Sequence, residues 1–237
     1  TDLGLFTCNE QFGADASSLF NVITGYSRPP EYKHFIVAPH GMRSFFEYMI
    51  RQETENAKKG LPSGITVKVN SLVDPKIIEL LYEASKAGVR VQLIVRGICC
   101  LIPGIEGVSE NITVMSIVGQ LLEHSRIFRF ENAGNPRIYM GSADWMPRNL
   151  DRRVELVFPI EDETQKARAF GILDTMLSDT TNARFMQSDT SYEHVDLRGK
   201  KKISSQLTFY HEAQARLKEL QSIEKDSVLI PIHSAEE

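Results

Sequence analysis

Cysteine is scarce in this chain: it has three, Cys8 and the adjacent pair Cys99 and Cys100, with no CxxC spacing. This argues against a disulfide framework and against a zinc finger. No apolar run approaches the roughly 18 to 20 residues that span a bilayer. Residues 1–6 contain neither an initiator methionine nor the basic and apolar segments of a signal peptide. We therefore expect a cytoplasmic protein whose sequence begins inside a longer polypeptide.

Lysine is missing between Lys86 and Lys166, whereas arginine is not. Arginine presents a rigid planar fork that meets two phosphate oxygens at once, so an arginine-only stretch favours oxyanion recognition. The alternative is that several of these arginines pair with neighbouring carboxylates. The net charge of -4 argues against a general polyanion-binding surface, and nucleic acid is not expected as a partner. The eight arginines of the stretch are Arg90, Arg96, Arg126, Arg129, Arg137, Arg148, Arg152 and Arg153.

Strand-like and helix-like segments alternate along most of the chain, which predicts an α/β domain with a mixed β-sheet flanked by helices. Asp74, Pro75 and Gly88 are placed as N-cap, first residue and C-cap of one of the helices. Ligands of such sheets bind at the carboxyl ends of strands, where Arg96 is expected. Strands are predicted at 35–38, 65–72, 89–95, 112–117, 126–130, 137–140 and 154–159, and helices at 42–59, 74–87, 161–178 and 204–222.

Domain boundaries are indicated by two composition changes. The double proline at 29–30 cannot continue a helix, so we predict that 1–33 is the tail of a preceding domain and that 34–222 is one domain. Residues 223–237 form a C-terminal tail that could be disordered or an added strand. The basic cluster 198–202 is either a solvated turn or a track for a polyanion.

His124 and Arg126 form the most informative motif. A lone histidine at the start of a predicted strand is more often structural. A phosphoryl-transfer enzyme, however, needs a proton donor that works near neutral pH, together with donors for the phosphate oxygens. His124-x-Arg126 resembles the H-x-K element of the phospholipase D superfamily, and the turn at 141–144 resembles its G-S-x-N element with Asp144 in place of asparagine.

The wider sequence resembles the C-terminal region of bacterial polyphosphate kinase, a family with a phospholipase D-like fold. The likeness extends to about residue 220. It implies reversible transfer of the terminal phosphate of ATP to inorganic polyphosphate through a phosphohistidine, whose histidine would lie upstream of this chain. The segments that carry the likeness are 61–65, 93–99, 101–104, 122–126 and 141–155.

The resemblance assigns His124 as the acid and base of the reaction and Arg96 as a phosphate-binding residue. Arg153 is expected on the transferring phosphate, and Arg126 and Ser142 are further candidates for phosphate binding. Asp144 is expected to anchor Arg153 or His124. No metal ligand is assigned in this chain, because those of Mg²⁺, expected with ATP, would lie mainly upstream.

The expected partners are ATP or ADP and polyphosphate. The full-length protein is expected to form a homo-oligomer, either a dimer or a tetramer. Whether it also associates peripherally with the inner membrane is left open by the sequence. Two alternatives remain: a phospholipase D-like phosphodiesterase acting on nucleic acid or lipid, and a non-catalytic module for polyanion binding or dimerisation. Because the phosphorylated histidine would lie upstream, the chain alone is expected to be inactive.

Overall fold

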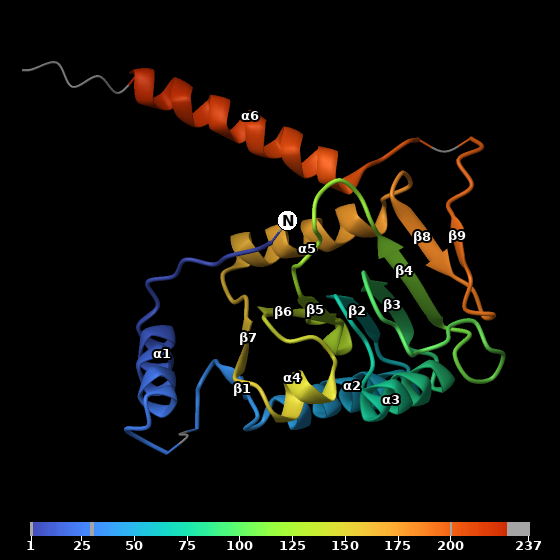
Figure 1. Cartoon of the computed structure of the whole chain (residues 1–237), viewed down its shortest axis with the longest axis horizontal. Coiled ribbons are helices and arrows are strands. Elements are labelled where there is room, and N and C mark those ends of the chain that lie inside the picture. Colours follow the sequence, from blue (N-terminus) through green and yellow to red (C-terminus); the bar gives the residue numbers. More distant parts are fainter. Residues whose placement is uncertain (1, 29–30, 200, 227–237) are drawn as a thin grey trace, which may run out of the picture.

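A computed structural model of the chain describes residues 2–28, 31–199 and 201–226 (Figure 1). Within these residues, nine strands form a single mixed sheet in the order β1-β7-β6-β5-β2-β3-β4-β8-β9. Strands β2, β3 and β4 are parallel, and every other neighbouring pair is antiparallel. The strands are β1 (Ile36–Ala38), β2 (Gly64–Val69), β3 (Arg90–Val95), β4 (Ile112–Ile117), β5 (Ile127–Phe130), β6 (Arg137–Gly141), β7 (Glu155–Pro159), β8 (Ala183–Met186) and β9 (Tyr192–His194).

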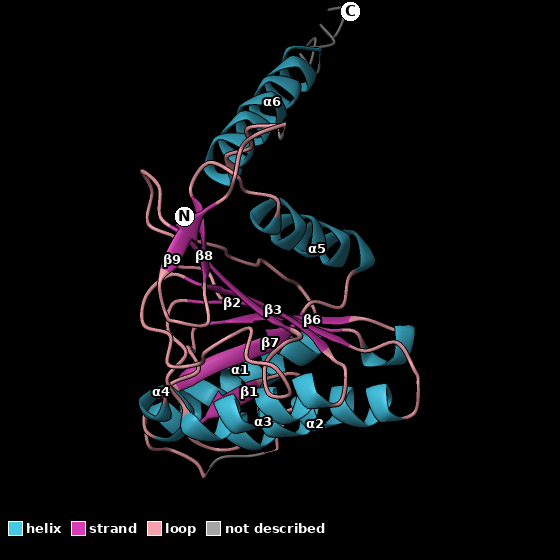
Figure 2. Ribbon diagram, turned by 90° about the vertical axis from the view of Figure 1, so that its right-hand side faces the viewer, coloured by secondary structure: helices cyan, strands magenta, loops and turns pink. Residues whose placement is uncertain are grey.

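Helices cover both faces of the sheet, which confirms the predicted α/β class. Figures 1 and 2 show α2 (Met42–Lys58) and α3 (Pro75–Lys86) on one face and α5 (Glu163–Leu177) on the other. Successive strand residues point to opposite faces. Leu93 therefore packs in the core under α2 and α3, whereas its neighbour Ile94 packs in the core under α5. Helix α6 (Ser205–Asp226) extends away from the sheet (Figure 2).

The start of α3 is formed as its sequence predicts. The Asp74 carboxylate accepts a hydrogen bond from the backbone N–H of Ile77 at 3.0 Å, and Pro75 is the first helical residue. At the other end the C-cap is Ala87, one residue before the predicted position, and Gly88 follows with φ +91°. Glycine adopts this left-handed conformation without a steric penalty, so the helix ends here without backbone strain.

Five elements were not predicted: α1 (Glu10–Ile23), the 3₁₀ helix η1 (Asn132–Gly134), the short α4 (Pro147–Asp151), β8 and β9. The sequence predicts no helix within 1–33, but Asn9 caps α1 there by accepting from Gln11 N at 2.9 Å. The buried Asp15 of α1 accepts from the backbone N–H groups of Lys33, His34 and Phe35 at 2.7–3.1 Å. These bonds fasten α1 to the segment that enters β1.

Three predictions fall wholly or partly outside the described residues: the connector at 29–30, Lys200 of the basic cluster, and the tail from 227 onward. The proposed domain boundaries therefore stay predictions. Residues 223–226 belong to α6. Among the described helices, none combines the length and the apolar character that crossing a bilayer requires.

Candidate active site

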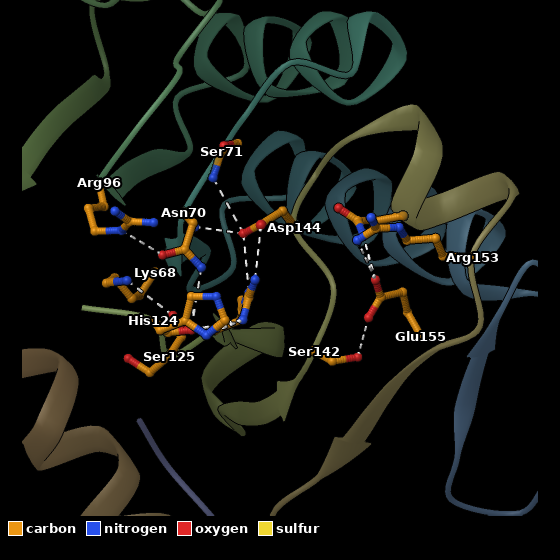
Figure 3. A network of polar contacts seen from close by, with 12 residues as sticks. Lys68, Asn70, Ser71, Arg96, His124, Ser125, Ser142, Asp144, Arg153 and Glu155 are labelled. Atoms are coloured by element: carbon orange, nitrogen blue, oxygen red, sulfur yellow. Dashed lines mark hydrogen bonds and ion pairs between the residues drawn. The ribbon is translucent and has the colours of Figure 1, made fainter. Parts of the chain in front are cut away.

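The carboxyl ends of β2 and β3 carry the first residues of the site. Asn70 and Arg96 directly follow these neighbouring parallel strands, so the predicted position of Arg96 at a strand end is confirmed. Arg96 Nε donates to Asn70 Oδ1 at 2.9 Å, and Asn70 Nδ2 donates to the backbone oxygen of His124 at 3.3 Å. Asn70 thus connects Arg96 to the segment 118–126, which joins β4 to β5 and contains His124 (Figure 3).

The His124 imidazole is anchored through Nδ1. This atom lies 3.3 Å from Asp2 Oδ2 and 3.1 Å from Arg126 Nη1. The two contacts require different states of Nδ1. The Asp2 carboxylate can only accept, so it needs a proton on Nδ1, whereas the Arg126 guanidinium can only donate, so it needs the lone pair of an unprotonated Nδ1. Nε2 of His124 has no hydrogen-bond partner among the described residues. The ring is therefore held at one nitrogen and open at the other.

Asp2 is itself held by several donors. Partial burial raises the pKa of its carboxyl, but the Leu3 N–H, the His124 ring and the Arg126 guanidinium lower it, and the net pKa lies below the usual value. The ionised form is thus favoured beside Nδ1.

Arg126 and Asp144 form a nearly buried ion pair. The Nε and Nη2 atoms of Arg126 lie 3.3 and 3.1 Å from the two carboxylate oxygens of Asp144, and their side chains are 12% and 10% exposed. Asp144 Oδ1 also accepts from the backbone N–H groups of Asn70 and Ser71 at 2.6 and 3.3 Å. The expectation that Asp144 anchors Arg153 or His124 is therefore wrong. Its charged partner is Arg126, which contacts His124 in turn.

Ser142 and Arg153 belong to a different group of contacts, centred on Glu155 (Figure 3). The Ser142 hydroxyl donates to Glu155 and accepts from Leu156 N at 3.1 Å. Arg153 Nη1 lies 4.0 Å from Glu155 Oε1, and its side chain is 57% exposed. Asn149 Nδ2 donates to the same oxygen at 2.5 Å. We call Ser142, Asn149, Arg153 and Glu155 the Glu155 cluster, and Asn70, Arg96, His124, Arg126 and Asp144 the His124 cluster.

A cavity of about 350 Å³ brings the two clusters together at one opening. His124 and Arg126 line it from the first cluster and Ser142 from the second, beside Asp2. Arg96 and Arg153 do not line this cavity. Three of the five predicted site residues therefore share a cavity, and the two remaining arginines lie in the surrounding contact networks.

Sequence reasoning missed Asn70, Lys68 and Gln206, which hold the segment around His124. Gln206 of α6 donates through Nε2 to Leu121 O and to Glu123 Oε1, both at 2.7 Å. The alternation of β2 does place Lys68 and Asn70 on one face. Nothing in that alternation indicates that the face is covered.

The described residues do not fit a magnesium site. They contain no group of three or more histidine, cysteine, aspartate or glutamate side chains that could hold a metal ion. The carboxylates of Asp144 and Glu155 are engaged with arginine, asparagine and serine donors. No step of the reaction is therefore assigned to a metal bound by these residues, and the prediction of upstream ligands stays a prediction.

Comparison with known proteins identifies a family. Residues 35–206 match the family model described as polyphosphate kinase C-terminal domain 2. A curated relative, the polyphosphate kinase of Lactiplantibacillus plantarum, is 50% identical over 218 residues, which is 92% of this chain and 30% of that protein. That of Parasynechococcus marenigrum is 53% identical over 192 residues, 81% of this chain and 27% of the relative.

A solved structure agrees with the sequence relatives. The crystal structure of polyphosphate kinase from Porphyromonas gingivalis superposes with a TM-score of 0.85 at 35% identity, covering 89% of this chain and 32% of that one. The chain thus spans less than a third of the length of each of these relatives.

Proposed function

Because this chain belongs to the polyphosphate kinase family, we propose that it supplies one part of a site that reversibly transfers the terminal phosphate of ATP to inorganic polyphosphate. The observation that carries this proposal is the His124 imidazole, anchored at Nδ1 and open at Nε2, with the Arg126 guanidinium beside it in one cavity. The phosphate-carrying histidine would come from a part of the family that this chain does not cover.

His124 acts as the acid and base of the proposed reaction through Nε2. When the ring is protonated, Nδ1–H faces the Asp2 carboxylate and Nε2–H can donate to the oxygen of departing ADP. After the proton has left, Nε2 can accept one from the acceptor phosphate. The Asp2 carboxylate can accept a hydrogen bond from Nδ1–H, and Arg126 Nη1 can donate to Nδ1 when that atom carries no proton, so Nδ1 keeps a partner in both states of the proposed cycle.

The three arginines of the site differ in whether they are free to bind phosphate. Arg96 uses Nε for Asn70, and its Nη1 and Nη2 atoms have no partner among the described residues, so they are available to phosphate oxygens. Arg153 is exposed and can reach a phosphate in the same way. Arg126 is already bound to Asp144 and to the backbone of His124, which makes it a support for the histidine more than a phosphate ligand. Ser142 would have to release Glu155 to bind phosphate.

The proposal is tested with a full-length enzyme that contains this sequence. We expect His124→Gln to lower ATP-dependent polyphosphate synthesis by at least about 100-fold, the usual contribution of acid and base catalysis. His194→Gln serves as the control, because His194 is exposed on β9. The chain of 237 residues alone should make no polyphosphate. Synthesis by the isolated chain, or cleavage of a phosphodiester in place of transfer from ATP, would contradict the proposal.

A further inference from the structure

The backbone around His124 is held by side chains and not by a strand partner. The carbonyl oxygens of Glu123, His124 and Ser125 all accept side-chain hydrogen bonds. Lys68 Nζ donates to Glu123 O at 3.3 Å and to Ser125 O at 3.1 Å, the residues on either side of His124. The oxygen of His124 accepts from Asn70 Nδ2 at 3.3 Å and from Arg126 Nη1 at 2.9 Å.

Lys68 holds this position at an energetic cost. Its side chain is fully buried on β2, on the sheet face opposite the one on which Val67 and Val69 enter the core. Burial lowers the pKa of its ammonium to about 8, against the opposing effect of Glu123 and Asp144, and Arg96 and Arg126 lower it further. A methionine would fill similar space without this desolvation cost. The ammonium therefore serves a need other than filling the core.

We propose that Lys68 is a positioning residue, which fixes the backbone on both sides of His124 and so sets the direction in which the imidazole faces the cavity. The direction of a side chain follows from the φ and ψ angles of its residue. Two hydrogen bonds from a single nitrogen to residues 123 and 125 restrain those angles at 124 from both sides. The consequence for catalysis rests on the proposed function, whereas the effect on the imidazole does not.

Gln206 holds the same segment at a second point, because it bonds Leu121 and the Glu123 side chain. None of these hydrogen bonds from Gln206, which belongs to α6, involves residue 124 or 125. It secures the entrance of the segment, whereas Lys68 secures the histidine itself.

The test is nitrogen-15 NMR of the His124 ring in the chain of 237 residues, which records its tautomers without any need for activity. The signals are assigned by their loss in His124→Gln, since the chain has six histidines. In Lys68→Met we expect both ring nitrogens of His124 to shift toward the values of a freely exchanging histidine. The contacts of Nδ1 with Asp2 and Arg126 require the native ring direction.

Val67→Ala is the matched control, because Val67 is also fully buried on β2 but packs on the opposite face. It removes core contacts and should leave the His124 signals unchanged. Native His124 signals in folded Lys68→Met would overturn the inference, and so would an equal shift in Val67→Ala. If Lys68→Met does not fold, Lys68→Gln, which keeps a donor without the charge, is expected to give intermediate shifts. Failure of both variants to fold would assign Lys68 to the fold as a whole and refute the inference.

Kinetics of the full-length enzyme give a second readout. Lys68→Met should lower kcat about 10- to 100-fold and leave KM for ATP within about twofold, because misplacing a catalytic group by about 1 Å has a cost of this order. Val67→Ala should keep kcat within about twofold. If His124→Gln proves fully active, the proposed function fails while the NMR result still decides whether Lys68 positions the ring.

Discussion

The His124 cluster and the Glu155 cluster each place an arginine beside a carboxylate, but the two arginines differ in burial and in the number of contacts that hold them. In the first, Arg126 and Asp144 are nearly buried, make two close contacts and are tied to the backbone of their neighbours. In the second, Arg153 is more than half exposed and reaches Glu155 only at 4.0 Å. Donors that are fixed before the reaction need no reorganisation when charge develops. An exposed arginine, in contrast, can turn toward an arriving phosphate.

The difference separates two kinds of work within one proposed reaction. Proton transfer requires a ring whose position is set in advance, and the His124 cluster provides it. Under the proposed function, binding of a polyphosphate chain that arrives and departs would require guanidinium groups that are free to turn, such as that of Arg153 in the Glu155 cluster and the Nη atoms of Arg96. Substitution of Arg126 or Asp144 should therefore change stability and activity together, whereas substitution of the exposed Arg153 should change activity with little effect on stability.

Asp144→Asn breaks the buried pair and should have the largest effect. It leaves the Arg126 guanidinium nearly buried without its carboxylate, so we expect the free energy of unfolding to fall by about 3 kcal/mol. Glu155→Gln, the equivalent change in the second cluster, should cost less, about 1 to 2 kcal/mol. The Glu155 side chain is only 11% exposed and loses an acceptor for Ser142 or Asn149, but the Arg153 guanidinium that it releases is 57% exposed and stays solvated. Urea denaturation of both variants measures the two values. Similar losses would show that the clusters do not differ as the burial of their two arginines, Arg126 and Arg153, indicates.

The ammonium of Lys68 should make the stability of the folded chain depend on pH in the alkaline range. Its pKa is about 8 when folded and 10.5 at its ordinary value. Between these values the unfolded chain binds more protons than the folded one, so this group makes stability rise with pH. The rise amounts to about 3 kcal/mol and is absent below pH 8.

The measurement is the difference in unfolding free energy between the native chain and Lys68→Met from pH 7 to pH 10.5. Taking the difference cancels the contribution of tyrosines that titrate in the same range, such as Tyr139, whose pKa is raised by burial, because these tyrosines are present in both proteins. A difference that stays constant with pH would contradict the buried, charged state of Lys68.

Gly141 lies between the clusters, and its replacement should disturb both. A Cβ atom at this position would come within 2.3 Å of the backbone oxygen of Leu156. Gly141→Ala is therefore expected to cost about 2 kcal/mol in unfolding free energy, because β6 and β7 must separate. Gly171→Ala is the control: it lies in α5 with open space around its Cβ and should stabilise the chain by about 0.5 kcal/mol. Two equal and small effects would show that the approach of β7 to Gly141 is not restrictive.

The sequence predicted most strands and helices to within a few residues, because the alternation of apolar residues is local. It also predicted Asp74 as an N-cap and Arg96 at a strand end. It did not predict that the segment 118–126 covers Lys68 and Asn70 on the polar face of β2, since this depends on residues far along the chain. A lysine on an alternating strand is normally solvated, and only the fold shows that Lys68 is buried.

The partner of Asp144 was missed for a related reason. The sequence led us to expect that Asp144 contacts Arg153 or His124, although Arg126 is also near Asp144 in sequence. The antiparallel pairing of β5 with β6 places the residue before one strand next to the turn after the other, and this brings Arg126 to Asp144. Sequence spacing alone does not give that register.

Arg153→Gln should have the smallest effect on stability and thereby isolates the second cluster. Because the side chain is 57% exposed and its ion pair is long, the loss should stay below about 0.5 kcal/mol. In the full-length enzyme, however, we expect synthesis to fall about tenfold, since a charged hydrogen bond to phosphate contributes about 1.5 kcal/mol or more. Arg152→Gln, at the exposed neighbouring position, is the control and should change neither value. A loss of stability as large as that of Asp144→Asn would place Arg153 in the supporting structure, and equal activity losses in both variants would mean that general positive charge, not this arginine, attracts the phosphate.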